Sequence, residues 1–103
     1  MSHFVLIALA NAVEGQEDTF NDWYDHQHIQ DVMAIDGIVG ARRLKVVGGD
    51  GRWQYLTVYD AETESPDIIL AEIRRRSGTK LMPVSDALDR RSVYFGLFSE
   101  LRT

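Results

Sequence analysis

The chain has 103 residues, 45% of them hydrophobic and 26% charged, which is the composition of a globular protein with one domain and a core of modest size. The formal net charge of −5 disfavours a nucleic-acid or anionic-membrane partner. The lack of cysteine excludes disulfides, thiol chemistry and cysteine-ligated metals.

The N-terminal segment predicts a strand. Residues 3–10, HFVLIALA, are apolar at successive positions, as expected of a central strand covered on both faces. The first 15 residues lack the basic start of a signal peptide, and their apolar run is too short to span a bilayer. We therefore expect a soluble, cytoplasmic protein whose single domain occupies residues 1–103.

Residues 17–37, EDTFNDWYDHQHIQDVMAIDG, predict an amphipathic helix. Acidic residues in its first turn suit the positive end of the helix dipole, and Gly37 suits a left-handed cap at its end. At about 100° per residue, one face of this helix carries a mostly apolar stripe. The stripe consists of Phe20, Tyr24, His28, Val32 and Ile35.

The rest of the chain predicts three strands and a second helix. Residues 38–48 form a polar strand typical of a sheet edge, and glycines at 48–51 form a hairpin turn. Residues 52–60 alternate strictly, which places an aromatic row on one face: Trp53, Tyr55, Thr57 and Tyr59. Ser65-Pro66 opens the second helix and Ser77-Gly78 closes it, before a loop over residues 79–90 and a last strand over residues 91–101.

The order β-α-β-β-α-β predicts an α+β, ferredoxin-like fold, with a four-stranded antiparallel sheet and both helices on one face. The opposite face would be bare. Because several strands are apolar on both faces, a monomer would expose a large apolar patch, which soluble monomers avoid. We therefore expect a homodimer packed sheet against sheet.

The main functional clue is His28, which lies within the apolar stripe of the first helix. Tyr24 lies one turn before it and Asp31 three residues after it, so the three side chains can meet on the helix surface. Asp31 could fix the imidazole tautomer while Tyr24 hydrogen-bonds a ligand. The alternative is a core histidine bonded to a backbone carbonyl.

Candidate substrate-binding residues accompany these three catalytic candidates. Trp23, Trp53, Tyr55 and Tyr94 could line a pocket, although an aromatic row can equally pack at the core or at the dimer interface. Arg42 and its neighbour Arg43 are either solvated charges at a sheet edge or a site for an anionic or enolate group.

The sequence gives little support for a metal site or for a nucleophilic serine. His26 and His28 point about 200° apart on a helix and cannot hold one metal, although His3 could join His28. Ser85 and Ser92 lack the glycines of a nucleophile elbow. We expect no metal and no cofactor.

The helix at residues 17–37, after a short strand and before GARRLK, resembles the first-helix signature of the dimeric α+β barrel superfamily, in particular its EthD-like branch. Members tend to show an Asn/Trp-Tyr pair, then His, then Pro-Asp, then a Gly that ends the helix. Trp23-Tyr24, His28, Asp31 and Gly37 match, and Gln30 stands where proline is common. The resemblance implies a pocket between this helix and the sheet, with His28 as the acid/base residue and Tyr24 and Asp31 as its partners.

Two functions are compatible with these residues. The first is a cofactor-independent acid/base enzyme, an isomerase, cyclase or lyase, acting on a small aromatic or carbonyl-containing metabolite. In it His28 moves a proton, Tyr24 stabilises an enolate or phenolate oxygen and Asp31 orients the imidazole. The second is a non-catalytic, small-ligand-binding or auxiliary protein of a degradative, EthD-like pathway, with the same pocket.

Overall fold

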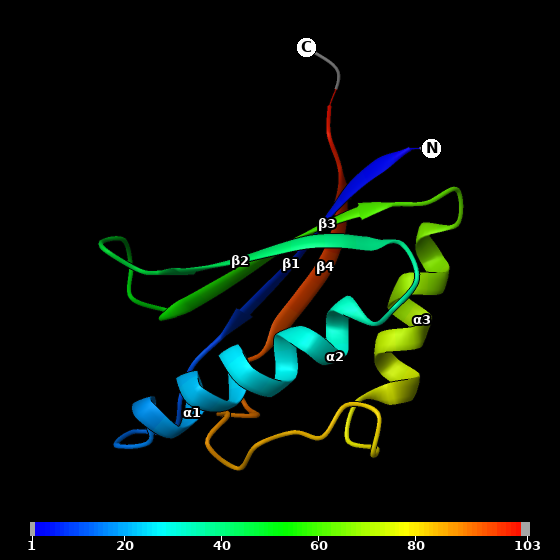
Figure 1. Cartoon of the computed structure of the whole chain (residues 1–103). Coiled ribbons are helices and arrows are strands. Elements are labelled where there is room, and N and C mark those ends of the chain that lie inside the picture. The colour runs from blue at the N-terminus through cyan, green and yellow to red at the C-terminus, as the bar shows by residue number, and fades with distance from the viewer. Residues whose placement is uncertain (1, 102–103) are drawn as a thin grey trace.

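The computed structural model describes residues 2–101. Strand β1 is followed by one long helix in three consecutive segments, then by two strands, a second helix and a last strand (Figure 1). The elements are β1 (His3–Ala10), α1 (Glu17–Trp23), η1 (Tyr24–His28), α2 (Ile29–Met33), β2 (Ile38–Lys45), β3 (Tyr55–Glu62), α3 (Pro66–Arg76) and β4 (Tyr94–Ser99). No helix within residues 2–101 is long and apolar enough to cross a membrane.

The four strands form one antiparallel sheet in the order β2-β3-β1-β4. Both helices lie on the same side of this sheet, so the fold is α+β and ferredoxin-like, as the element order predicted (Figure 1). In the register of the central strand, Leu6 lies opposite Tyr59 on one side and opposite Leu97 on the other. These three residues therefore share the sheet face that the helices cover.

Alternation in β3 decides which way its aromatic row points. Four alternate residues of the strand are buried: Tyr55, Thr57, Tyr59 and Ala61. Their neighbours Leu56 and Val58 are only partly buried and lie on the opposite face. The tyrosines of the row therefore face the helices and not the open face of the sheet.

The bounds of three strands were predicted wrongly. β2 ends at Lys45 instead of residue 48, β3 begins at Tyr55 instead of residue 52, and β4 is shorter than residues 91–101. The reason at β3 is a side chain: the Asn11 amide donates to the Arg52 carbonyl (2.9 Å) and accepts from the Gln54 N–H (2.7 Å). These bonds satisfy backbone groups that a longer strand would have used in its ladder.

The first helix contains a π turn, η1, that helical periodicity did not predict. The Ile29 N–H donates to the Tyr24 carbonyl, five residues back, where an α-helix would reach back four. In an α-helix, residues five apart point about 140° apart. The wider turn brings Trp23 and His28 together, with ring centroids 4.6 Å apart and nearly parallel planes.

The first helix ends at Met33 with the right-handed Ala34 as its C-cap, so the predictions that it extends to residue 37 and that Gly37 caps it are wrong. Gly37 has φ of +99° and lies in the turn that leads into β2. A Cβ at this position would lie 3.3 Å from Ile69 Cδ1 and 3.4 Å from the Glu62 carbonyl oxygen. The glycine thus allows both the turn into β2 and the close approach of α3 to the sheet.

We expect Gly37→Ala to lower the free energy of unfolding by about 2 kcal/mol, because it adds a crowded Cβ to a left-handed backbone. Gly15→Ala is the control, since Gly15 also has positive φ (+83°) but an added Cβ would meet nothing within 4 Å. Urea denaturation of both variants measures the difference. If both variants lose the same free energy of unfolding, the contacts around residue 37 add nothing to the cost of the substitution.

Candidate functional site

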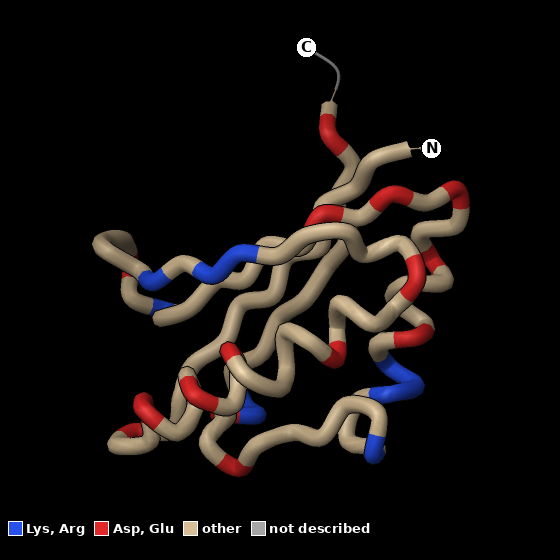
Figure 2. The backbone as a smooth tube through the Cα atoms, in the orientation of Figure 1, with Lys and Arg blue, Asp and Glu red and all other residues tan. Residues whose placement is uncertain are grey.

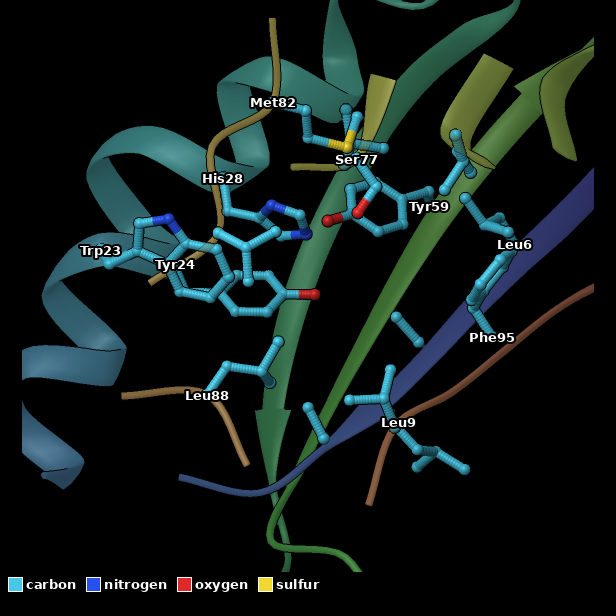
Figure 3. A pocket seen from close by; sticks show the side chains of 16 residues that line it. Leu6, Leu9, Trp23, Tyr24, His28, Tyr59, Ser77, Met82, Leu88 and Phe95 are labelled. Atoms are coloured by element: carbon cyan, nitrogen blue, oxygen red, sulfur yellow. The ribbon is translucent and has the colours of Figure 1, made fainter. Parts of the chain in front are cut away.

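A partly enclosed cavity of about 120 Å³ lies between the first helix and the sheet. Figure 3 shows Tyr24 and His28 projecting into it from the helix and Tyr59 projecting from β3 towards them. The other walls are mainly apolar and include Leu6 and Phe95 from the sheet. Sequence reasoning expected a pocket in this place, and the structure has one.

The loop between α3 and β4 covers part of the cavity. Met82, Val84 and Leu88 of this loop line it. The Trp23 indole N–H donates to the Pro83 carbonyl (3.2 Å), which ties the loop to the helix. Trp23 therefore does line the cavity, as predicted, and it does so while stacked on His28.

His28 is a partly buried imidazole whose Nδ1 atom is fully buried and unsatisfied. Its ring lies against Trp23 and edge-on to Tyr24 (centroids 4.8 Å apart), and its Nδ1 is buried without a hydrogen-bond partner. Burial, opposed by the charge of Asp31 and aided by the positive charge of Arg43, lowers the pKa of His28 to about 4. The imidazole is therefore neutral at pH 7 and has one nitrogen free to accept or donate.

Two tyrosine hydroxyls share the cavity with His28. Tyr24 and Tyr59 are almost fully buried, and burial raises the pKa of each phenol. The Thr57 and Tyr59 hydroxyls and the Arg43 charge partly offset this rise at Tyr24. The Tyr59 hydroxyl is buried without a hydrogen-bond partner, so it can serve a bound molecule. Sequence reasoning placed Tyr59 in the aromatic row but did not name it as a site residue.

Asp31 does not take the position that helical spacing predicted. Its carboxylate accepts a hydrogen bond from the Gln27 amide (2.9 Å) instead of from the His28 ring. It acts on His28 only through its charge. The π turn changes the angular relation between residues 24–28 and those that follow, which is why the spacing rule of a regular α-helix failed at this position.

Arg43, and not Arg42, is the arginine near the site. Its guanidinium carbon lies 4.4 Å from the Tyr24 ring centroid, and its nitrogens donate to Asp25 (2.9 Å) and Asn21 (2.8 Å). Arg42 is exposed and sits on the opposite face of β2. Strand alternation could have distinguished them, because Arg43 is paired with the inward-facing Thr57.

The remaining predicted binding residues lie outside the cavity lining. Trp53 donates its indole N–H to the Ser92 carbonyl (3.0 Å) and packs near Tyr94, which is largely exposed. Tyr55 packs on Phe20 (5.0 Å between ring centroids) in the core cluster that also contains Tyr24, but it does not line the cavity. The structure brings together Trp23, Tyr24 and His28 but none of these other aromatic residues.

Residues 2–101 contain no cluster of three or more His, Cys, Asp or Glu side chains suited to a metal ion. His26 is exposed and lies 3.5 Å from Asp22, while His3 lies 3.2 Å from Asp60 near the end of the sheet. Neither histidine lines the cavity.

We expect the partly buried, neutral His28 to make stability depend on pH. Between pH 6.5 and about 4 the unfolded chain binds a proton at residue 28 that the folded chain does not. The free energy of unfolding should therefore be at its maximum above pH 6.5 and fall by about 3 kcal/mol as the pH drops to 4. Urea midpoints of the wild type and His28→Gln across this range test it, and parallel curves would contradict it.

No protein-family model and no curated protein matches the sequence. Its structure is similar to a "putative monooxygenase" of Shewanella loihica PV-4 (TM-score 0.68, 12% identity, 99% of this chain and 97% of that one). It is similar to an EthD family protein of Bacillus halodurans C-125 (TM-score 0.60, 13% identity, 96% and 99%). A DABB family protein of Mesorhizobium loti MAFF303099, described as ferredoxin-like, has TM-score 0.60 at 10% identity (99% and 100%). The chain therefore has a ferredoxin-like fold, and an EthD family protein and a DABB family protein are among its structural neighbours.

Proposed function

We propose that the protein is a cytoplasmic, cofactor-independent acid/base enzyme that acts on a small aromatic or carbonyl-containing molecule, with His28 as the proton acceptor. The observation that carries the proposal is the neutral imidazole of His28, which is partly buried at an apolar cavity with an unpartnered nitrogen. Buried polar atoms without a partner are rare and costly, about 1–3 kcal/mol each, so their presence at a cavity favours a ligand-binding role.

The chemistry would begin with proton transfer. His28 would take a proton from a carbon next to a carbonyl, and the electron pair of the broken C–H bond would move onto the carbonyl oxygen. A tyrosine hydroxyl, from Tyr24 or Tyr59, would donate to the resulting enolate oxygen. Return of the proton to a different carbon gives an isomerase, and loss of a leaving group gives a lyase.

Arg43 supports this reaction without contacting the substrate. Its positive charge offsets a small part of the rise in the pKa of Tyr24 and Tyr59 that burial causes, and it would favour an enolate in the cavity for the same reason. An enolate next to the imidazole would in turn raise the pKa of His28, because opposite charges attract strongly in a site of low dielectric. A base that is weak in the empty site therefore becomes stronger as the reaction proceeds.

A second function, ligand binding without catalysis, is favoured by one observation. With a pKa of about 4, His28 in the empty cavity is far from the pKa near neutrality that suits a general base. The same cavity could then hold a small molecule for an auxiliary protein of a degradative pathway, with His28 only as a hydrogen-bond partner.

The two functions predict different results for one pair of variants. If His28 is the base, His28→Gln should lower kcat by about 100-fold or more, while the Kd of the ligand changes little. His26→Gln, two residues away on the exposed side of the helix, should leave both unchanged. Candidate ligands come from an NMR screen of small aromatic and carbonyl compounds, read at His28. Unchanged turnover in His28→Gln would exclude His28 as the base of an enzyme.

We also propose that the protein is a homodimer formed through the open face of the sheet. This face is apolar along its middle, where Ile7 is paired with Val58, and large apolar side chains such as Phe98 are exposed on it. Figure 2 shows that β1 and β4 carry no acidic residue, lysine or arginine, and Arg42, which shares this face with Val58, lies on β2 at the edge. An apolar face of this kind on a soluble protein is usually covered by a partner.

Val58→Asp places a charge in the middle of that face and should convert dimers to folded monomers at micromolar concentration. Ile68→Asp is the control, because Ile68 is 57% exposed on α3, on the helix side of the sheet. Sedimentation measures the mass of each variant, and circular dichroism checks the fold. A wild type that sediments as a monomer at micromolar concentration would contradict the proposal.

A further inference from the structure

No charged side chain of residues 2–101 lines the cavity. None of the lining residues is an aspartate, glutamate, lysine or arginine. The only titratable groups among them are His28, Tyr24 and Tyr59, and burial keeps all three neutral at pH 7. A molecule that enters the cavity therefore meets no counter-ion among the residues that line it.

Arg43 cannot supply that counter-ion. Its guanidinium does not line the cavity, and two of its nitrogens already donate to Asp25 and Asn21. Its direct ion pair is with Asp25 (2.9 Å), and its charge reaches the cavity only through space. Burial of an unpaired carboxylate is strongly unfavourable, so an anionic ligand would be rejected.

The cavity does offer polar atoms to an uncharged ligand. The Tyr59 hydroxyl and the Nδ1 of His28 are both buried without a partner, and they belong to side chains that face each other from the sheet and the helix (Figure 3). A hydroxyl can donate and accept, so one oxygen on the ligand would satisfy it. A purely apolar ligand would leave it unsatisfied.

The size of the cavity limits the ligand to about one ring. A cavity of about 150 Å³ in another protein binds benzene, and this one is about 120 Å³. A molecule with a six-membered ring and one small polar group therefore fills it, given slight movement of the covering loop.

We propose that the cavity selects an uncharged, single-ring molecule with one oxygen function, which the Tyr59 hydroxyl holds. The corresponding carboxylate is rejected. This selectivity rests on the proposed function and narrows its substrate class. Tyr59 is then a specificity-determining residue for the site, in addition to Trp23, Tyr24 and His28.

Two matched pairs of probes test this at pH 7, with binding followed by the NMR signals of the Trp23 indole N–H. Benzamide and benzoate have nearly the same shape but differ in charge, and phenol and toluene differ in one hydroxyl. Benzamide should bind at least tenfold more tightly than benzoate, and phenol more tightly than toluene. Equal or tighter binding of benzoate would overturn the charge selectivity.

Tyr59→Phe removes only the hydroxyl and should abolish the preference for phenol while leaving the Kd of toluene unchanged. Tyr94→Phe is the control, because its hydroxyl lies away from the cavity. If phenol keeps its preference in Tyr59→Phe, Tyr59 does not determine specificity although the cavity stands as a ligand site. If no probe shifts the Trp23 signal in the wild type, both the selectivity and the proposed function fail.

Discussion

The extra residue in the π turn is the constraint on which the candidate site depends. It puts Trp23 and His28, five residues apart, into a stack, and it does so while Tyr24 remains buried against the sheet. Both neighbouring helical segments keep their apolar side towards the core, with Phe20 before the turn and Val32 after it. The turn is thus accommodated within the helix, and its effect is concentrated on the three aromatic rings that the helix contributes to the cavity.

On the sheet side, Arg43 makes that arrangement possible. A guanidinium at the boundary between helix and sheet would be costly if it were unpaired, but Asp25 and Asn21 on the helix accept from it and the Tyr24 ring lies close to it. The same side chain thereby joins β2 to the first helix and sets the electrostatic environment of the cavity. After this packing, three buried atoms remain unpaired among the described residues: the Nε of Arg43 itself, the Nδ1 of His28 and the Tyr59 hydroxyl.

Much of this could be predicted from the sequence, because periodicity reports which face of an element is buried. It located the helix, the inward direction of Tyr24 and His28, and the fold. It missed features that depend on contacts between particular side chains: the bonds from Asn11 that delay the start of β3 and leave Trp53 in a loop, and the pairing of Gln27 with Asp31. The π turn was missed for a different reason, since its single extra residue hardly disturbs the pattern of apolar positions.

The hydrogen bond between the Trp23 indole and the Pro83 carbonyl joins the covering loop to the ring that stacks on His28. The covering loop is held by the same ring that shields His28 from water. If the loop swings away to admit a molecule, the imidazole becomes hydrated and its pKa rises towards the ordinary value of a histidine. When the loop closes, the imidazole loses this water again. The proton affinity of His28 would then follow the position of a loop that lies far from it in the sequence.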